Sequence, residues 1–573
     1  MNHTPKKTLF MKIPFIRTLY ATGVLSSIFF SLLACAQAKS ERPNIVFILA
    51  DDLGYMDLVA YASHISGESR GNTYYETPVI DQLIDEGVMF TQAYASPLCS
   101  PTRSSVLTGK YPARHGFMTA TPGGYQTYYN QGKEPAPGFY LQDGIENKVD
   151  RPFWPLTQGV TNIALPLRET SLAEALPGYH SAFIGKWHLG GHGSEGFSPA
   201  DQGFEEIAWF DAGGSPYFNW RKLWNKRTKL HPAMAQEQLQ HGNAGKETGE
   251  AYLTDDLSVQ AARFIEQQAD KEKPFFLYFC HFAVHSPFQA KQQYIQYFAR
   301  KATRGWNGHS NPTYAAMLKS LDDSVGMVLD ALKSSGQIDN TIIVFMSDNG
   351  GIVHPDASGK PQISNNAPLK GEKALLYEGG IRVPLFVWYP KKLEAAICNV
   401  PVECSDLLPS LRHLSGKPLE PGQHDVDGVS FVSLLLDPAN SNGGYARDTF
   451  FWHYPFYVSV GLNQGDLTGP RSAIRKRDWK LILDWEGGLE LYNIREDLSE
   501  STDRSNSEPE LTYQLLNELV LWLDDTVETR YIPKTNNRYQ PGHPKARSFK
   551  NIFEENALPW PSGRPTRVAQ QMP

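Results

Sequence analysis

Short, nearly continuous apolar runs recur along the first two thirds of the chain. Such runs are typical of strands that are buried on both faces of a parallel sheet. The runs are Asn44–Ala50, Ser181–Gly185, Pro274–Phe279, Thr341–Met346 and Pro384–Trp388. Stretches with helical periodicity lie between them, and this alternation of strand and helix predicts an α/β fold.

The stretch Thr77–Glu86 shows the helical pattern most clearly. We expect Thr77 to cap the helix and Pro78 to occupy its first turn, while Gly87 ends it. The apolar residues in between share one helix face, and Ala315–Leu332 has a similar period. The predicted fold is therefore a large, mostly parallel mixed sheet sandwiched by helices.

The pattern changes near residue 440. Arg471–Asp484 and Leu489–Asn493 read as antiparallel strands, and Pro509–Asp525 reads as an amphipathic helix. We therefore expect a large domain over residues 39–440, and a smaller α+β subdomain with a short antiparallel sheet and a tail over 441–573.

The first residues have the pattern of an export signal. Positive residues precede the apolar run Ala21–Ala36, and Ala36–Ala38 fits a small-residue cleavage site, which predicts a signal peptide over residues 1–38. Alternatively, Leu32–Cys35 resembles a lipobox, which would make residues 1–34 a lipoprotein signal with a lipid anchor on Cys35. Either way we expect export, to the periplasm or the medium, with membrane anchoring as the lipoprotein alternative.

Composition narrows the possible partners. The chain has 573 residues, of which 41% are hydrophobic and 20% charged, as in an ordinary globular protein. Removal of residues 1–38 takes away four positive charges and no negative ones, which lowers the net charge from −7 to −11. So acidic a protein is a poor candidate for binding nucleic acid through a broad basic face, and an anionic substrate would have to be bound locally.

Charged and polar side chains follow four of the predicted strands at their carboxyl ends, where open α/β sheets bind ligands. They are Asp51 and Asp52, then Lys186 and His188, then His281 and His285, and finally Asp348 and Asn349. Adjacent carboxylates such as Asp51 and Asp52 repel each other unless a cation or hydrogen-bond donors compensate. Oxygen ligands of this kind favour Ca²⁺ or Mg²⁺ over zinc. Together with Arg103 and Lys370, the cationic residues of this set would suit a tetrahedral dianion or monoester.

Cys99 lies in the stretch Ser96–Gly109 and could be a structural thiol, half of a disulfide, a metal ligand or a nucleophile. Cys398 and Cys404 are close enough in sequence to pair, although they could equally stay reduced. The chain has no CxxC motif, so the sequence gives no support to a zinc site or a thioredoxin-type site.

Several of these segments together resemble the type I sulfatase family. Cys99-Ser100-Pro101-Thr102-Arg103, followed by Thr108-Gly109, resembles the pattern C-x-P-S/T-R-x-x-x-x-T-G, and Gly185–Gly190 resembles the second signature of the family. The match continues through ADDLG, SDNGG and APLKGEKALLYEGGIRVP, and it covers roughly residues 43–500.

The resemblance implies an alkaline phosphatase-like fold. It implies that a formylglycine-generating or anaerobic sulfatase-maturating enzyme oxidises Cys99 to formylglycine (3-oxoalanine). It also implies one Ca²⁺ held by Asp51, Asp52, modified Cys99, Asp348 and Asn349. The catalytic residues that it implies are Cys99, Arg103, Lys186, His188, His285 and Lys370. The hydrate of formylglycine would attack sulfur, His285 with Lys370 nearby would protonate the leaving alcohol, and His188 would release sulfate from the sulfo-enzyme intermediate.

Export and a content of 12% aromatic residues suggest a sulfated poly- or oligosaccharide as substrate, either algal (carrageenan or ulvan) or of glycosaminoglycan type. Candidate sugar-binding residues are His115, Asp211, Tyr217 and His453. Two alternatives remain open: a phosphomonoester or phosphonate hydrolase of the same superfamily, and a non-catalytic binder of sulfated sugars.

Overall fold

The computed structural model describes Met1 and residues 42–564, apart from 121–144, 147–150, 158, 191–195, 211–212, 219, 221–243, 246–249, 303–307, 355–362, 420–424 and 460–466. The chain divides into two units, Met1–Glu41 and Arg42–Pro573. Apart from Met1, both versions of the predicted export signal lie outside the described residues, and so does Cys35. All described helices and strands belong to the second unit.

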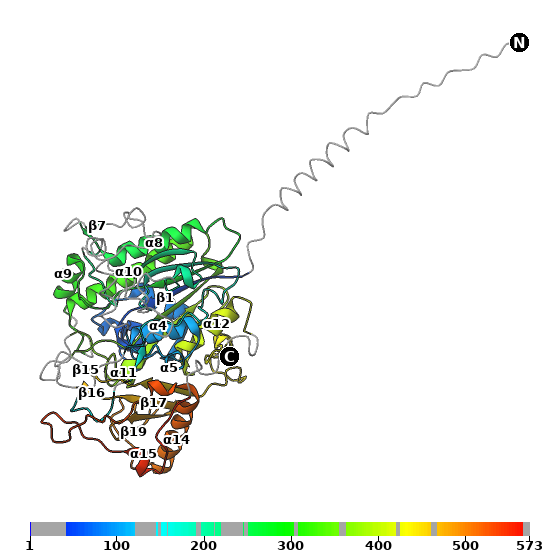
Figure 1. Ribbon diagram of the computed structural model, residues 1–573. Helices are drawn as coiled ribbons and strands as arrows, with labels where there is room; N and C mark the ends of the chain where they lie inside the picture. Colours follow the sequence, from blue (N-terminus) through cyan, green and yellow to red (C-terminus); the bar gives the residue numbers. More distant parts are fainter. Residues whose placement is uncertain are drawn as a thin grey trace. The chain divides into compact units, whose positions relative to one another are not determined.

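A nine-stranded mixed sheet forms the centre of this unit, as the apolar runs predict (Figure 1). Its strand order is β12 (Ala396–Cys398), β2 (Val88–Tyr94), β11 (Arg382–Trp388), β10 (Thr341–Ser347), β1 (Asn44–Ala50), β9 (Phe275–Cys280), β5 (His180–Lys186) and β6 (Glu206–Phe210), and β13 (Val402–Glu403) also pairs with β2. The strands β1, β9, β10, β5 and β6 pair in parallel, and all residues of β1, β9 and β10 are buried.

The predicted strand Pro384–Trp388 corresponds to β11, which runs antiparallel to both of its neighbours. Its pairing with β2 shifts register between Val383 and Leu385, at Pro384. Proline has no N–H to donate to a ladder, so a shift in register at this position is the expected accommodation.

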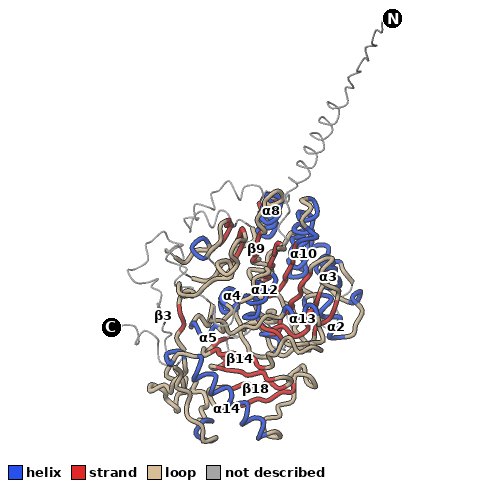
Figure 2. Tube along the Cα trace, turned by 90° about the vertical axis from the view of Figure 1, so that its right-hand side faces the viewer, coloured by secondary structure: helices blue, strands red, loops and turns tan. Residues whose placement is uncertain are grey.

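Helices pack against the sheet in two groups that contact one another within each group (Figures 1 and 2). One group contains α2 (Val59–Ser66), α3 (Pro78–Glu86), α8 (Leu253–Gln267), α9 (Gln292–Arg300) and α10 (Pro312–Ser334). The other contains α4 (Cys99–Thr108), α5 (Pro112–His115), α12 (Leu407–Leu414) and α13 (Val432–Leu436). The predicted α/β fold class is confirmed.

The start of α3 differs from the prediction. Its bounds agree, but the Thr77 hydroxyl makes no capping bond and donates instead to Asp81 Oδ2 at 3.2 Å. Asp322 on α10 takes the capping role, because its Oδ1 accepts the Val79 and Ile80 N–H groups at 2.9 Å each. A carboxylate from a distant part of the chain thus satisfies the free N–H groups of this helix end.

A separate four-stranded antiparallel sheet lies in the C-terminal part, as expected. Its order is β14 (Thr449–Tyr454), β17 (Arg471–Lys476), β18 (Trp479–Asp484) and β19 (Gly488–Asn493), and α14 (Pro509–Thr526) packs on β17 and β18. The short helix α15 (Ile552–Glu555) follows, and α11 (Glu378–Ile381) precedes β11. The remaining strands form two-residue pairs: β3 (Ile145–Glu146) with β4 (Thr161–Asn162), β7 (Ala244–Gly245) with β8 (Glu250–Ala251), and β15 (Val458–Ser459) with β16 (Leu467–Thr468).

The hydrophobic core forms two clusters. The larger one surrounds the nine-stranded sheet, and the smaller one surrounds the C-terminal sheet. The smaller cluster also includes Tyr94, Leu98, Leu376 and Ile381 from the larger part of the chain. The C-terminal sheet therefore shares its core with segments next to the start of α4 and next to α11.

Candidate active site

The carboxyl ends of adjacent strands bring together the acidic residues that are far apart in sequence. Asp51 and Asp52 follow β1, and Asp348 and Asn349 follow β10, the next strand in the sheet. The Asp52 N–H donates to Asp348 Oδ1 at 3.2 Å, and the Asn349 side-chain amide donates to Asp52 Oδ1 at 2.8 Å. All four side chains are buried, so the chain holds several carboxylates together away from water.

Helix α4 presents Cys99 and Arg103 to these carboxylates. Cys99 is the first residue of the helix and Arg103 follows one turn later, so both lie on the same helix face. The Arg103 guanidinium donates to Asp348 Oδ2 from Nε at 3.1 Å and from Nη2 at 2.8 Å, and to the Lys186 carbonyl from Nη1 at 2.8 Å. Arg103 therefore ties the end of β10 to the end of β5.

Lys186 and His188 approach from the end of β5, as predicted. Lys186 Nζ lies 2.6 Å from Asp51 Oδ2, and His188 Nδ1 lies 3.3 Å from Cys99 Sγ. His188 (φ 55°) and Asp52 (φ 59°) both have left-handed backbone conformations. Such conformations cost energy in residues other than glycine and are concentrated at functional sites.

His285 lies on the other side of Asp52. Its Nδ1 is 2.6 Å from the Ser286 carbonyl, which can only accept, so Nδ1 is the donor and Nε2 faces Asp52 Oδ2 at 3.6 Å. Burial lowers the pKa of His285 to about 3, even though the charge of Asp52 opposes the shift. His285 is therefore neutral at ordinary pH in this state of the site.

The assignment of Lys370 to the site is wrong. Its Nζ donates to the Tyr492 hydroxyl and to the Glu500 carbonyl, both at 3.1 Å, and so points to the C-terminal sheet. Lys373, three residues later, reaches the site instead, with Nζ 2.5 Å from Asp52 Oδ1. The segment is not helical, so spacing along the sequence does not decide which lysine faces the pocket.

The acidic cluster fits a bound cation. Asp51 Oδ1, Asp52 Oδ2 and Asn349 Oδ1 are buried and have no hydrogen-bonding partner. Ligand atoms of Asp51, Cys99 and Asp348 lie within 4.8 Å of one another, as do those of Asp51, Asp52 and His285. Buried oxygens are normally hydrogen-bonded, and a hard cation such as Ca²⁺ satisfies carboxylate and amide oxygens of this kind. The predicted oxygen ligands therefore fit the metal.

The electrostatics of the cluster reflect burial and the neighbouring cations. Burial raises the pKa of Asp51 and of the Cys99 thiol, although Lys186 acts against both shifts. Burial also acts to raise the pKa of Asp52, but the charges of Lys373 and Lys186 act against it, and the pKa is lowered overall. Burial favours the neutral form of Lys373, yet Asp52 and Cys99 raise its pKa, so Lys373 remains an ammonium ion.

Three of the four candidate sugar-binding residues lie in described parts of the chain, and Asp211 lies outside them. Tyr217 is buried, and its hydroxyl donates toward the Phe282 carbonyl (2.6 Å) and the His285 carbonyl (2.9 Å), so it supports the segment that carries His285. His115 is buried and its Nδ1 accepts the Phe117 N–H at 3.3 Å. Burial lowers the pKa of His115 to about 4.

His453 does not face the cluster. Its Nδ1 is 2.7 Å from the Ser472 hydroxyl and its Nε2 is 3.2 Å from the Tyr531 carbonyl, so both ring nitrogens are engaged within the C-terminal part. The structure therefore contradicts the interpretation of His453 as a sugar ligand.

Tyr454, the next residue on β14, was missed by the sequence reasoning and points to the opposite face. Burial raises the pKa of Tyr454 to about 12, a bond with Thr119 lowers it, and the charges of Cys99 and Lys373 also act on it. The alternation of side chains along a strand is the signal that could have separated Tyr454 from His453.

Cys99, Cys280, Cys398 and Cys404 are all buried free thiols. The pair Cys398 and Cys404, which sequence left open, is therefore reduced here. In the described part of the chain, no helix is both long and apolar enough to span a bilayer.

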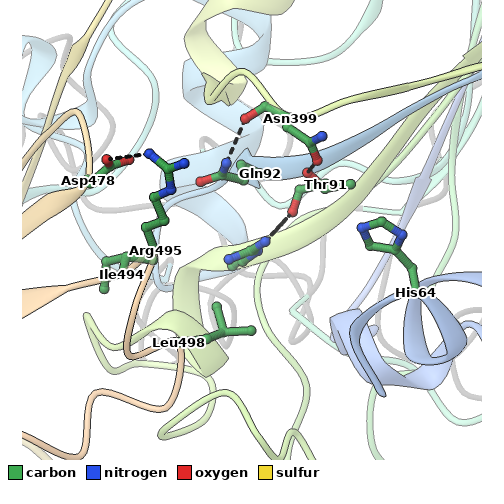
Figure 3. Close-up of a pocket in the computed structure, with 9 residues that line it drawn as sticks. His64, Thr91, Gln92, Asn399, Asp478, Ile494, Arg495 and Leu498 are labelled. Atoms are coloured by element: carbon green, nitrogen blue, oxygen red, sulfur yellow. Dashed lines mark hydrogen bonds and ion pairs between the residues drawn. The ribbon is translucent and has the colours of Figure 1, made fainter. Parts of the chain in front are cut away.

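A cavity of about 510 Å³ lies elsewhere, and its lining includes none of the cluster residues (Figure 3). Its lining side chains largely bond to one another or to nearby backbone: Gln92 Nε2 donates to the Asn399 carbonyl at 2.6 Å, and Arg495 lies 3.7 Å from Asp478. It therefore lacks the unsatisfied charged groups that distinguish the acidic cluster.

A mostly parallel mixed sheet with carboxylates and cations at its carboxyl edge is the architecture of the alkaline phosphatase-like superfamily of hydrolases. Residues 43–417 match the model of the Sulfatase family, and the chain belongs to that family. It is thus a sulfatase.

Two curated relatives and one solved structure illustrate the relationship. A protein named Sulfatase from Formosa agariphila is 30% identical over 86% of this chain and 91% of its own length. N-acetylgalactosamine-6-sulfatase from Mus musculus is 31% identical over 75% of this chain and 72% of its own. The crystal structure of Ps i-CgsB in complex with k-i-k-neocarrahexaose has a TM-score of 0.60 and 28% identity, covering 91% of this chain and 98% of that one.

Proposed function

We propose that this sulfatase hydrolyses sulfate esters of an extracellular sulfated carbohydrate, with residue 99 as the nucleophile after its conversion from cysteine to formylglycine. The observation that carries this proposal is the position of Cys99. It begins α4, lies 3.3 Å from a His188 ring nitrogen, and has ligand atoms of Asp51 and Asp348 within 4.8 Å. The helix N-terminus adds positive potential where negative charge would develop on a sulfuryl group.

The thiol itself is a poor nucleophile here, because burial raises its pKa and keeps it protonated at neutral pH. Formylglycine in its hydrated form would instead offer two hydroxyl groups at the same place. One hydroxyl loses its proton and attacks sulfur, the bond from sulfur to the substrate oxygen breaks, and the alcohol leaves a sulfate ester on residue 99. Loss of the proton from the second hydroxyl then breaks the bond between the carbon and the sulfate oxygen, so that sulfate leaves and the aldehyde is restored. The maturation enzyme that would modify Cys99 is therefore a proposed partner of this chain.

His188 is placed to accept that second proton, since its Nδ1 already contacts the side chain of residue 99. On the substrate side, we assign protonation of the leaving alcohol to His285, assisted by the ammonium group of Lys373. His285 Nε2 faces the pocket, and the charge of a bound sulfate ester would raise its pKa from about 3. Lys186 and Arg103 complete the positive lining.

Asp51, Asp52, Asp348, Asn349 and the side chain of residue 99 would hold one Ca²⁺. When bound, the ion would supply positive charge that stabilises the anionic form of the nucleophile and the sulfuryl oxygens. The cations Lys186, Lys373 and Arg103 hold the carboxylates in place through direct ion pairs.

For the substrate we propose a sulfated galactan or a related oligosaccharide. The support is the relationship to Ps i-CgsB, whose crystal structure contains a neocarrahexaose, and the export signal expected within residues 1–38. Glycosaminoglycan oligosaccharides are the alternative, supported by the relationship to N-acetylgalactosamine-6-sulfatase. The expected export would bring the protein to the periplasm or the medium, or to a membrane surface as a lipoprotein, where it would encounter such polymers.

The test is a panel of defined sulfated oligosaccharides from carrageenan, ulvan and glycosaminoglycans, incubated with fully matured enzyme. We expect loss of sulfate from one class, detected as desulfated product by mass spectrometry. The mass of the peptide containing residue 99 is measured on the same sample. An unmodified thiol in active enzyme contradicts the nucleophile assignment, and release of phosphate but not sulfate from matched esters contradicts the function.

A further inference from the structure

The loop from Lys370 to Glu378 connects the active site with the C-terminal sheet. Lys373 points in one direction, with its ammonium 2.5 Å from Asp52 Oδ1. Lys370, Tyr377 and Glu378 point in the other direction and contact the C-terminal sheet or the segment that follows it. One short segment thus carries a catalytic cation between two attachment points.

The first attachment point is Lys370. Its Nζ donates to the Glu500 carbonyl and to the Tyr492 hydroxyl at 3.1 Å each, and it lies 4.1 Å from the centre of the Tyr377 ring. The Tyr377 hydroxyl in turn donates to Glu490 on β19 at 2.7 Å. These contacts hold the start of the loop, and the residue before Glu378, against β19.

The second attachment point is Glu378, the first residue of α11. Its Oε1 lies 2.9 Å from Lys480 Nζ, and its backbone N–H donates to Glu500 Oε2 at 2.7 Å. Lys480 Nζ also lies 2.8 Å from Glu500 Oε1. All three side chains are fully buried, so Lys480 is a buried cation shared by two carboxylates.

The two charges of a buried ion pair must stay close together, because their separation leaves each charge uncompensated in a low-dielectric interior. The other oxygen of Glu378 is also engaged, since the Tyr94 hydroxyl donates to Oε2 at 2.7 Å and Arg382 Nη1 lies 3.4 Å from it. Glu378 can therefore adopt few alternative positions. Lys480 and Glu500 hold it from the side of the C-terminal sheet, and Tyr94 and Arg382 hold it from the side of the nine-stranded sheet.

The backbone of the loop connects Glu378 with the segments that surround the active site. The Lys373 N–H donates to the Gly351 carbonyl at 3.2 Å, and the Ala374 N–H donates to the Pro97 carbonyl at 2.8 Å, two residues before Cys99. A Cβ on Gly350 would lie only 1.9 Å from the Gly379 carbonyl oxygen, so α11 and the turn after Asn349 are in closest contact. A shift of α11 would therefore move the turn after Asn349, and with it the Gly351 carbonyl that accepts the Lys373 N–H.

We propose that Lys480 and Glu500, on the C-terminal sheet and the segment after it, are positioning residues that place the Lys373 ammonium against Asp52 by anchoring Glu378. The inference rests on the proposed function of the site, in which Lys373 acts on the substrate. It assigns the C-terminal part a share in catalysis without any contact between these two residues and the substrate.

A double-mutant cycle tests the inference. We expect Lys480→Met to lower kcat/KM for sulfate release by about 10- to 100-fold, the range for a catalytic group displaced by about 1 Å. In a Lys373→Ala background the same substitution is expected to change kcat/KM less than about 2-fold, because the group that it positions is absent. Equal losses in both backgrounds would show a general structural defect and overturn the proposal.

Lys476→Met is the matched control. Lys476 lies on β17 of the same sheet, but it pairs with Glu518 at 2.7 Å and not with the loop, so we expect kcat/KM within about 2-fold of wild type. If Lys480→Met does not fold, Glu500→Gln replaces it in the cycle, since it removes one charge and keeps the side-chain shape. Additive losses with Glu500→Gln would equally overturn the inference.

A measurement without substrate separates this inference from the proposed function. Acylation of Lys373 by a small amine-reactive ester is followed by peptide mass spectrometry in wild type and in Lys480→Met. We expect several-fold faster acylation in the variant, because its ammonium is no longer held on Asp52. Unchanged acylation overturns the positioning role, whereas absence of sulfate release from matured wild-type enzyme overturns only the function.

Discussion

The carboxyl edge of the nine-stranded sheet and the contact between α11 and the C-terminal sheet both bury several charged groups, but they use them differently. At the sheet edge, Asp51, Asp52 and Asn349 each keep one buried oxygen without a hydrogen-bonding partner. At the α11 contact, Glu378 and Glu500 share the ammonium of Lys480. Several unsatisfied oxygens gathered at one place indicate a site for a ligand. Two carboxylates that face one buried ammonium at 2.9 and 2.8 Å indicate a structural connection.

The same contrast separates residues of the same type. Lys373 and Lys370 are three residues apart, yet one contacts Asp52 and the other contacts Tyr492 and Glu500. His188 contacts the side chain of residue 99, while His453 has both ring nitrogens bonded inside the C-terminal part. Residue type alone does not assign a histidine or a lysine to the site.

The largest expected effect is at residue 99. We expect Cys99→Ala to abolish sulfate release, with a loss of at least about 10³-fold, because no side chain remains to attack sulfur. The melting temperature should change little, and circular dichroism checks the fold. Cys398→Ala, at another buried free thiol, is the control and should retain activity. Sulfate release by Cys99→Ala would refute the role of residue 99.

The next largest effect is expected from removal of calcium, which tests whether the unsatisfied oxygens of the acidic cluster bind a cation. A chelator should remove most activity and lower the melting temperature, because the clustered carboxylates lose their counter-charge. Calcium at about 100 times its Kd should restore about 2.7 kcal/mol of stability relative to the metal-free protein. Calorimetry measures the melting temperature and the gain in stability with calcium. Asp51→Asn should reduce that gain. An identical melting temperature with and without calcium would contradict the metal assignment.

Substitution of the two lysines of the loop, Lys373 and Lys370, is expected to lower kcat by smaller and clearly different amounts. We expect Lys373→Ala to lower kcat by about 10²-fold, as for the loss of one charged group that stabilises the transition state. Lys370→Ala should lower it only several-fold, because it removes one of two attachment points of the loop. Steady-state kinetics on the same sulfate ester measures both values. The opposite order would restore Lys370 to the site.

The smallest expected effect concerns α3, far from the chemistry. Asp322→Ala removes the carboxylate that accepts two N–H groups at the start of this helix, and should cost about 1–2 kcal/mol of unfolding free energy. Thr77→Ala should cost less than Asp322→Ala, since its hydroxyl makes no capping bond and contacts only Asp81 Oδ2 at 3.2 Å and the Val59 N–H at 3.4 Å. Chemical denaturation of both variants compares them. A larger loss for Thr77→Ala would reinstate it as the cap.

Local pattern predicted the fold well because buried strands and amphipathic helices depend on residues that are neighbours in sequence. The bounds of β1, β10, α3 and the C-terminal strands agree with the apolar periodicity to within a few residues. Pattern did not predict the direction of β11, since a buried run reads alike in a parallel and an antiparallel strand. Pattern could not predict that Asp322 caps α3 either, because Asp322 lies on a helix more than two hundred residues away in sequence.

For the site, the sequence by itself determined the chemistry at the strand ends: Asp51, Asp52, Asp348, Asn349, Lys186 and His188 follow apolar runs, and topology brings such ends to one edge. The motif around Cys99 determined the family resemblance. Only the tertiary structure decided that Lys373 and not Lys370 reaches Asp52, and that His453 is held within its own sheet. A loop has no fixed period, so the direction of its side chains depends on which distant groups satisfy their charges.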